Sequence, residues 1–244
     1  MKTLIRTSIA FALITLASAF DQTHSTWSEL LGKHVKADGV AYASFKKDKG
    51  QLDAYLKTLA DVPNTEFNGW TGSEQLAFFI NLYNAATIEL VLKKYPIKSF
   101  KDDINGKEGP WKLKIVKALG KTYTLDEVEH ELIRKNYPEP RIHFAVNCAS
   151  EGCPPLRAEA FTGKKLEAQL AEQTKLFLAK KDNNYLEENT LYLSSIFDWF
   201  KEDFIKKSGS VEAFVAPYFP SGKVKKGSTT IKYTDYGWSL NQAK

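Results

Sequence analysis

Residues 73–95 read SEQLAFFINLYNAATIELVLKKY, and this stretch decides the fold. Apolar side chains occupy nearly every face of the helix that it would form, which is typical of a helix buried at the centre of a domain. Ser73 can cap the start of this helix, and Pro96 ends it. Charged residues such as Glu74 and Glu89 argue against a membrane span. The sequence therefore predicts a buried central helix.

Weaker periodic patterns flank this helix on both sides. Apolar residues at helical spacing predict further helices over residues 26–35, 51–60, 122–135, 164–180 and 194–204. Thr124 and Glu127 fit a capping box at the start of the third of these. Short strands are expected over residues 141–147, 191–193 and 229–233. We expect one α+β domain over residues 20–244, mostly helical, with a small antiparallel or mixed sheet.

Residues 1–19 have the pattern of a secretory signal peptide. Lys2 and Arg6 precede an apolar run, and Ala17-Ser18-Ala19 supplies the small residues of a cleavage site. We therefore expect an exported protein, periplasmic or secreted, with no membrane span after residue 19. The remaining chain has 32 Lys and Arg against 29 Asp and Glu, a formal charge of +3. This near balance argues against a nucleic-acid partner.

Two asparagines interrupt the apolar faces of the central helix. Asn81 and Asn84 are three residues apart, so they share one face. A buried amide must be hydrogen-bonded. Either both amides hold neighbouring backbone, which we favour, or they orient a catalytic side chain or line a pocket.

The helix predicted over residues 122–135 carries a second polar signal. Glu129 lies within its apolar stripe, and His130 lies at the edge of that stripe. Burial, or pairing with an arginine such as Arg134 or Arg141, must shift the pKa of Glu129, and shifted carboxylates gather at functional sites. His143 lies in a predicted strand, where a core position is favoured over a role in a site.

The two cysteines, Cys148 and Cys153, allow four interpretations. They form a disulfide, which an oxidising compartment permits. Alternatively, Cys148 is a catalytic thiol at the end of a strand. A zinc site with His130 and His143 has suitable ligand types but not the usual short spacing. Two inert thiols are the fourth interpretation. Spacing alone slightly favours the disulfide.

Several blocks together resemble the domain-of-unknown-function 547 family, which occurs in exported bacterial proteins and as a C-terminal domain in plant proteins. The blocks keep the family's order over roughly residues 27–241; they lie at residues 74–85, 125–134, 141–150, 154–157, 196–200 and 203–204. The ending departs from the family's usual Tyr-Asp-Trp-Ser-Leu-Asn, because Gly237 takes the position of the acid.

The resemblance implies a thiol hydrolase site, similar in residue types to papain-like and transglutaminase-like enzymes. Plant members of the family keep the position of Cys148 but not that of Cys153, which favours a catalytic Cys148. We expect hydrolysis of an amide, peptide or γ-glutamyl bond in a small peptide-like substrate. Cys148 would be the nucleophile and His130 the general base, with His143 as the rival base.

The other candidate residues would support this chemistry. Glu129 would orient a histidine, or pair with His143 or Arg141, and Asn81 or Asn84 would orient the base or hold the oxyanion. No cofactor and no metal are expected, and the oligomeric state is left open.

The alternative is a non-catalytic exported binding domain with a structural Cys148–Cys153 disulfide. Trp199, Phe200, Tyr236 and Trp238 would then line a groove for a peptide or glycan, although aromatic residues of this kind most often pack in a core.

Overall fold

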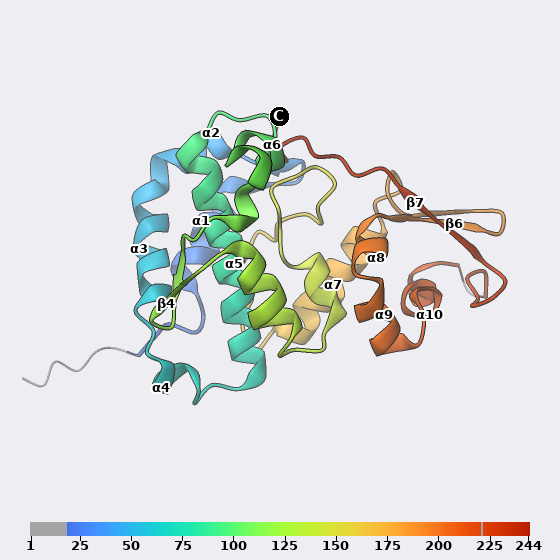
Figure 1. Ribbon diagram of the computed structural model, residues 1–244, viewed down its shortest axis with the longest axis horizontal. Coiled ribbons are helices and arrows are strands. Elements are labelled where there is room, and N and C mark those ends of the chain that lie inside the picture. Colours follow the sequence, from blue (N-terminus) through green and yellow to red (C-terminus); the bar gives the residue numbers. More distant parts are fainter. Residues whose placement is uncertain (1–18, 221) are drawn as a thin grey trace, which may run out of the picture.

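The computed structural model describes residues 19–220 and 222–244 (Figure 1). The predicted signal peptide therefore lies outside the described residues, except for Ala19. The α-helices are α1 (Ser25–His34), α2 (Tyr42–Phe45), α3 (Lys49–Ala60), α4 (Asn64–Phe67), α5 (Gly72–Lys94), α6 (Phe100–Asp103), α7 (Leu166–Leu178), α8 (Ile196–Trp199), α9 (Lys201–Ser208) and α10 (Val211–Val215).

Helices of other types and short strands connect them. The π-helix is η4 (Glu127–Arg134), and the 3-10 helices are η1 (Lys46–Asp48), η2 (Gly106–Glu108), η3 (Pro110–Lys112), η5 (Pro140–Phe144) and η6 (Ala216–Tyr218). The strands are β1 (Val35–Lys36), β2 (Gly39–Val40), β3 (Val116–Ala118), β4 (Lys121–Tyr123), β5 (Tyr185–Glu187), β6 (Thr190–Ser194) and β7 (Thr230–Thr234). The fold is α+β and mostly helical, as predicted.

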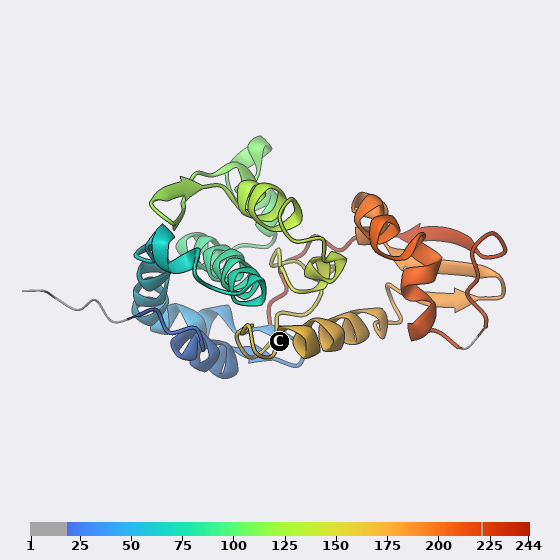
Figure 2. The same ribbon diagram turned by 90° about the horizontal axis from the view of Figure 1, so that it is seen from below.

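Helix α5 is the buried central helix, and it is surrounded by α3 and η4 among others (Figures 1 and 2). Its cap differs from the prediction. Thr71, not Ser73, precedes the helix, and its hydroxyl accepts a hydrogen bond from the Glu74 amide while the Glu74 carboxylate accepts one from the Thr71 amide. This capping box satisfies two amides at the helix start. By length and hydropathy α5 could cross a membrane, but 89% of its most apolar window is buried inside the protein.

The strand predicted over residues 141–147 is wrong. The chain forms the 3-10 helix η5 there, because Pro140 stands at its first position and the Glu139 carboxylate accepts a hydrogen bond from the Arg141 amide. A proline at a helix start has the backbone angle that a helical turn needs. The apparent alternation in RIHFAVN is therefore not that of a strand.

The largest sheet has three strands and is mixed, as predicted. β5 pairs antiparallel with β6, with Leu186 opposite Leu191, and β6 pairs parallel with β7, with Leu191 opposite Ile231. β1 with β2 and β3 with β4 form two small antiparallel pairs. The three-stranded sheet covers a second apolar core, to which Phe144, Phe177 and Phe197 belong.

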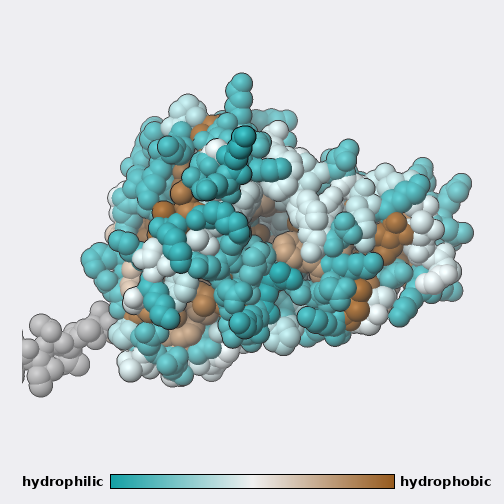
Figure 3. All heavy atoms as spheres, viewed as in Figure 1, coloured by the Kyte–Doolittle hydropathy of each residue, from teal (hydrophilic) through white to brown (hydrophobic). Residues whose placement is uncertain are grey.

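The C-terminal segment runs back from β7 across the molecule to the vicinity of α6 (Figure 1). Its backbone bonds to three distant segments: Leu240 N–H donates to the Lys98 carbonyl, Asn241 N–H to that of Ala149, and Ala243 N–H to that of Val40. The Glu151 amide donates to the Ser239 carbonyl in the same segment. Polar side chains cover most of the face drawn in Figure 3. The returning segment joins the sheet region to the part built around α5.

Candidate functional site

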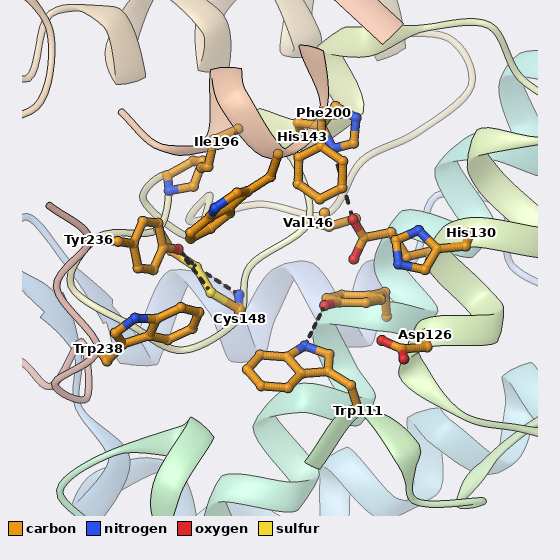
Figure 4. Close-up of a pocket in the computed structure, with 15 residues that line it drawn as sticks. Trp111, Asp126, His130, His143, Val146, Cys148, Ile196, Phe200, Tyr236 and Trp238 are labelled. Carbon is orange, nitrogen blue, oxygen red and sulfur yellow. Dashed lines mark hydrogen bonds and ion pairs between the residues drawn. A yellow bond between two sulfur atoms is a disulfide. The ribbon is translucent and has the colours of Figure 1, made fainter. Parts of the chain in front are cut away.

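A pocket of about 250 Å³ lies between the region of α5 and η4 and the C-terminal region (Figure 4). Aromatic rings form much of its wall: Tyr83, Trp111, Trp199, Phe200, Tyr236 and Trp238. Trp199 is 48% exposed and stands at the rim. The polar groups of the wall are both cysteines, both pocket histidines and two carboxylates: Cys148, Cys153, His130, His143, Asp126 and Glu129. Such a pocket, apolar with a few polar groups, is typical of a small-molecule site.

The cysteines form a disulfide in the pocket wall. Cys148 is half-buried, whereas Cys153 is buried. The Tyr236 hydroxyl lies 3.1 Å from each sulfur, and the Cys148 amide donates to the Cys153 sulfur at 3.0 Å. Burial raises the pKa of the Tyr236 phenol, so this group stays neutral. Cys148 is therefore not a free thiolate in this structure.

A glycine, Gly152, allows Tyr236 to reach the sulfurs. The Gly152 amide donates to the Gly237 carbonyl at 2.9 Å. A Cβ atom at position 152 would lie 2.9 Å from the Gly237 nitrogen and from the Tyr236 ring, so only glycine fits without movement. This close approach lays the segment with Tyr236 and Trp238 against residues 148–153, which we call the cysteine loop.

Carboxylates and an imidazole lie across the pocket from the sulfurs. In Figure 4, Asp126 and His130 stand on one side, while Cys148, Tyr236 and Trp238 stand on the other. Thr124 and Glu127 form the predicted capping box at the start of the helix that carries Glu129 and His130. Glu129 is 7% exposed, and burial raises its pKa to about 7. Sequence periodicity indicated a shifted pKa, because Glu129 lies in an apolar stripe, but it did not give the direction of the shift.

His143 is fixed at the buried end of the pocket. Its Nε2 is bonded to Asp203 Oδ2 at 2.8 Å, and its ring stacks on Phe200 with the centroids 3.8 Å apart. Its Nδ1 has no hydrogen-bond partner among the described residues and lies 3.9 Å from Glu129 Oε1. Burial lowers the pKa of His143 to about 4, so the ring is neutral near neutral pH.

The predicted Cys–His pair is not assembled in this structure. Within residues 19–220 and 222–244, neither sulfur hydrogen-bonds to an imidazole. His130 Nδ1 instead lies 3.1 Å from an Arg134 guanidinium nitrogen, and burial lowers its pKa. The structure brings Cys148, His130, Glu129 and His143 to one pocket, but with the sulfurs and His130 on opposite sides.

The other three predicted residues hold the fold around the pocket rather than line it. The Asn81 amide bonds both backbone groups of Phe161, at 2.7 and 3.0 Å. The Asn84 amide donates to the Ala145 carbonyl and accepts from the Asn147 amide, at 2.9 and 2.8 Å. Arg141 pairs with Glu139 and Glu167, and not with Glu129. Backbone support was the favoured interpretation of the asparagines.

Sequence reasoning missed four residues of the site: Tyr83, Trp111, Asp126 and Asp203. Tyr83 accepts a hydrogen bond from the Trp111 indole at 3.2 Å, and Asp203 binds both Arg134 and His143. Tyr83 had a signal, since it carries a hydroxyl and lies beside Asn84 on a helix whose faces are mostly apolar. Asp203 stands 60 residues after His143, and no local pattern connects them.

The structure contains no group of three His, Cys, Asp or Glu side chains suited to hold a metal ion within its described residues. The disulfide also uses both sulfurs that the zinc interpretation requires.

The segment that carries η4, η5 and the cysteine loop is similar to a known protein family. Residues 67–178 match the family model described as "Protein of unknown function, DUF547". This segment belongs to the DUF547 family. No curated protein and no solved structure matches the chain. The DUF547 match includes Glu129, His143 and both cysteines, whereas Asp203 and Tyr236 lie beyond its end. The pocket thus combines the matched segment with later parts of the chain.

Proposed function

We propose that this protein is an exported, non-catalytic binding domain whose aromatic pocket takes a small ligand with an ammonium group. One observation carries the proposal: the buried Glu129 carboxyl lies in a ring-lined pocket with no arginine or lysine bonded to it among the described residues. Aromatic faces attract organic cations, and a buried carboxylate gains from a cationic partner. The disulfide is structural in this proposal.

The charges around the pocket favour a cation. Of the three nearby carboxylates, Asp126 pairs with Lys112 and Asp203 pairs with Arg134. Glu129 has the neutral His143 at 3.9 Å and the Tyr83 hydroxyl as a hydrogen-bond partner, and the nearby Arg134 is bonded to Asp203 instead. Burial of an unpaired carboxylate is costly, which is why the pKa of Glu129 is raised to about 7. A ligand ammonium group would supply the missing positive charge and favour the ionised carboxylate.

Isothermal titration calorimetry tests the proposal with choline, tetramethylammonium and n-butylamine at pH 8. The matched neutral probe is 3,3-dimethylbutan-1-ol, which has the shape of choline without its charge. We expect a cation to bind at least about tenfold more tightly than the neutral probe, since 1.4 kcal/mol corresponds to a factor of ten. Glu129→Gln and Trp238→Ala should each remove most of this preference.

The control is Tyr218→Ala, which removes an exposed aromatic residue that is not part of the pocket wall. It should leave the affinities unchanged. Equal binding of choline and its neutral analogue, or no binding of any of the three cations, would contradict the proposal.

A second candidate is the thiol hydrolase of the sequence analysis, acting on an amide, peptide or γ-glutamyl bond. It is favoured by the position of Cys148, whose half-buried sulfur lines a pocket that also holds two histidines and Glu129. This function requires a low-molecular-weight thiol to reduce the disulfide first. It also requires movement that brings an imidazole to the sulfur, since a nucleophile and its base must come within hydrogen-bond reach.

Thiol labelling separates the two candidates. The hydrolase predicts that reduced protein reacts with iodoacetamide at Cys148 rapidly at pH 6, and that His130→Ala or His143→Ala slows the reaction. The binding domain predicts slow labelling that neither substitution changes.

A further inference from the structure

The first residue after the predicted cleavage site is held by specific contacts. The Phe20 backbone nitrogen donates to Glu66 Oε1 at 2.8 Å. The Phe20 ring contacts three others, with its centroid 5.1 Å from that of His24, 5.5 Å from that of Trp70 and 5.8 Å from that of Phe78. These contacts fix both the backbone nitrogen and the side chain of Phe20.

The chain is ordered directly after this residue. The Asp21 carboxylate accepts hydrogen bonds from the amides and hydroxyls of Thr23 and Ser25, at the start of α1. The buried His24 bonds the Tyr55 hydroxyl at 2.7 Å through Nδ1. Helix α1 therefore places Phe20 firmly against α4 and α5.

The surroundings of the Phe20 nitrogen are acidic. A cavity of about 400 Å³ at this end of the molecule is lined by Phe20, Asp21, His24, Tyr55, Asp61 and Glu66, together with uncharged residues and without any lysine or arginine. Burial lowers the pKa of His24 to about 4 and raises that of Tyr55, so both are neutral near neutral pH. Glu66 takes part in no ion pair within the described part of the chain.

We infer that Phe20 is the first residue of the mature protein and that its free α-ammonium group forms an ion pair with Glu66. Hydrolysis of the Ala19–Phe20 peptide bond by a signal peptidase consumes one water. Ala19 keeps the carbonyl and becomes a carboxylate, and the Phe20 nitrogen becomes an amine that is protonated at neutral pH. The same nitrogen that donates to Glu66 as an amide then donates as a cation, which makes a stronger hydrogen bond.

This inference rests on the proposed export of the chain, but the ion pair is testable without export. Four chains, released from a cleavable fusion, begin at Phe20 or at Ala19, each with Glu66 or with Glu66→Gln. At pH 6.5 the chain that begins at Phe20 should have a Tm about 2–4 °C above that of the chain that begins at Ala19. Glu66→Gln should abolish this difference, because the comparison isolates the pair.

The pH dependence gives a second readout. Pairing with a carboxylate raises the pKa of the α-amino group above its ordinary range of about 7.7–8.0. The stabilisation is then complete below that range and is lost as the pH rises through the higher folded pKa. The difference in Tm should therefore vanish at pH 10. Asp21 and Asp61 also line this cavity. The hydrogen bonds from Ser25 and Thr23 outweigh the burial of Asp21 and hold the pKa of its carboxyl well below the usual range.

Two results of the Tm comparison would overturn the ion pair. One is an equal Tm of the chains that begin at Phe20 and at Ala19 at pH 6.5, and the other is an effect of Glu66→Gln that is matched by Glu29→Gln, an exposed carboxylate on α1. Intact mass of protein exported from the complete sequence tests the processing separately. A mature chain that begins at Phe20 supports the inference, and one that begins elsewhere contradicts it, whereas the Tm comparison tests the ion pair alone.

Discussion

At the scale of single residues, Glu129 and His143 face each other at the buried end of the pocket, and burial moves their pKa values in opposite directions. The pKa of Glu129 rises to about 7, and that of His143 falls to about 4. Both shifts favour the neutral form, since desolvation penalises charge. Asp203 stays ionised, because its bonds to His143 and Arg134 outweigh its own burial and hold its pKa well below the usual range.

These two shifts have opposite effects on stability. The folded state of Glu129 binds more protons than the unfolded state between pH 4.5 and about 7, so stability falls as the pH rises through this window. The folded state of His143 binds fewer protons between about pH 4 and 6.5, so its contribution rises with pH there. In the native protein the two contributions partly cancel.

Glu129→Gln should reveal this balance. The variant keeps the neutral shape of the side chain and loses its titration, so its free energy of unfolding relative to the native protein should increase from pH 4.5 to pH 8, by up to about 3 kcal/mol. Urea unfolding at half-unit pH steps measures this difference. Glu131→Gln, an exposed residue of the same helix, is the control. A difference between Glu129→Gln and the native protein that does not change with pH would contradict the assignment.

At the scale of elements, α5 organises the site through two amides rather than through catalytic groups. Asn84 satisfies a carbonyl and an amide of the turn that joins η5 to Cys148, and Asn81 does the same for both backbone groups of Phe161. Both side chains are almost wholly buried. The central helix therefore sets the position of the cysteine loop directly.

Asn84→Ala should be strongly destabilising. It leaves the Ala145 carbonyl and the Asn147 amide buried without partners, at a cost of about 1–3 kcal/mol for each unsatisfied group. The two groups together cost about 2–6 kcal/mol, so we expect a Tm lower by about 4–24 °C, measured by circular dichroism. Asn68→Ala, at an exposed position just after α4, should change the Tm by less than about 2 °C. A loss for Asn84→Ala no larger than that of Asn68→Ala would show that the amide does not anchor the loop.

At the scale of the whole molecule, the pocket is closed by a segment from the far end of the chain. Tyr236 and Trp238 reach it only because residues 236–243 return from β7 and bond to the cysteine loop, Lys98 and Val40. The Asn241 side chain accepts from the Tyr42 hydroxyl at 2.7 Å and donates to Asn147 at 3.3 Å. The end of the chain thus completes both the fold and the site.

Removal of residues 235–244 should therefore abolish ligand binding as well as lower the Tm. The truncated chain loses two aromatic walls of the pocket and the backbone bonds that hold the cysteine loop. Calorimetry with choline and a thermal melt measure the two effects. Deletion of Lys244 alone, whose amide contacts only the exposed Asp38 side chain, is the control. Unchanged cation binding by the truncated chain would exclude the proposed pocket.

The sequence predicted those features that depend on interactions between residues close together in the chain. The central helix, the Thr124–Glu127 capping box, the strands near residues 191–193 and 229–233 and a shifted pKa of Glu129 all follow from spacing of a few residues, whereas the third strand β5 and the pairing of the strands do not. The conformation around His143 does not follow from local spacing. The alternation in RIHFAVN resembles that of a strand, whereas Pro140 and the Glu139 side chain favour a 3-10 helix. Partners such as Asp203 meet their residues only through tertiary packing, which single-sequence spacing does not contain.

The disulfide in the pocket wall has one last consequence. A dissolved thiol that opens this bond must approach a sulfur, and Cys153 is buried while Cys148 is reachable from the pocket. A ligand seated there would stand in the way of that approach. The rate at which free thiols appear in a mild reductant would then fall as the fraction of protein with bound ligand rises. Ligand occupancy could therefore be measured from this rate without a label on the protein or the ligand.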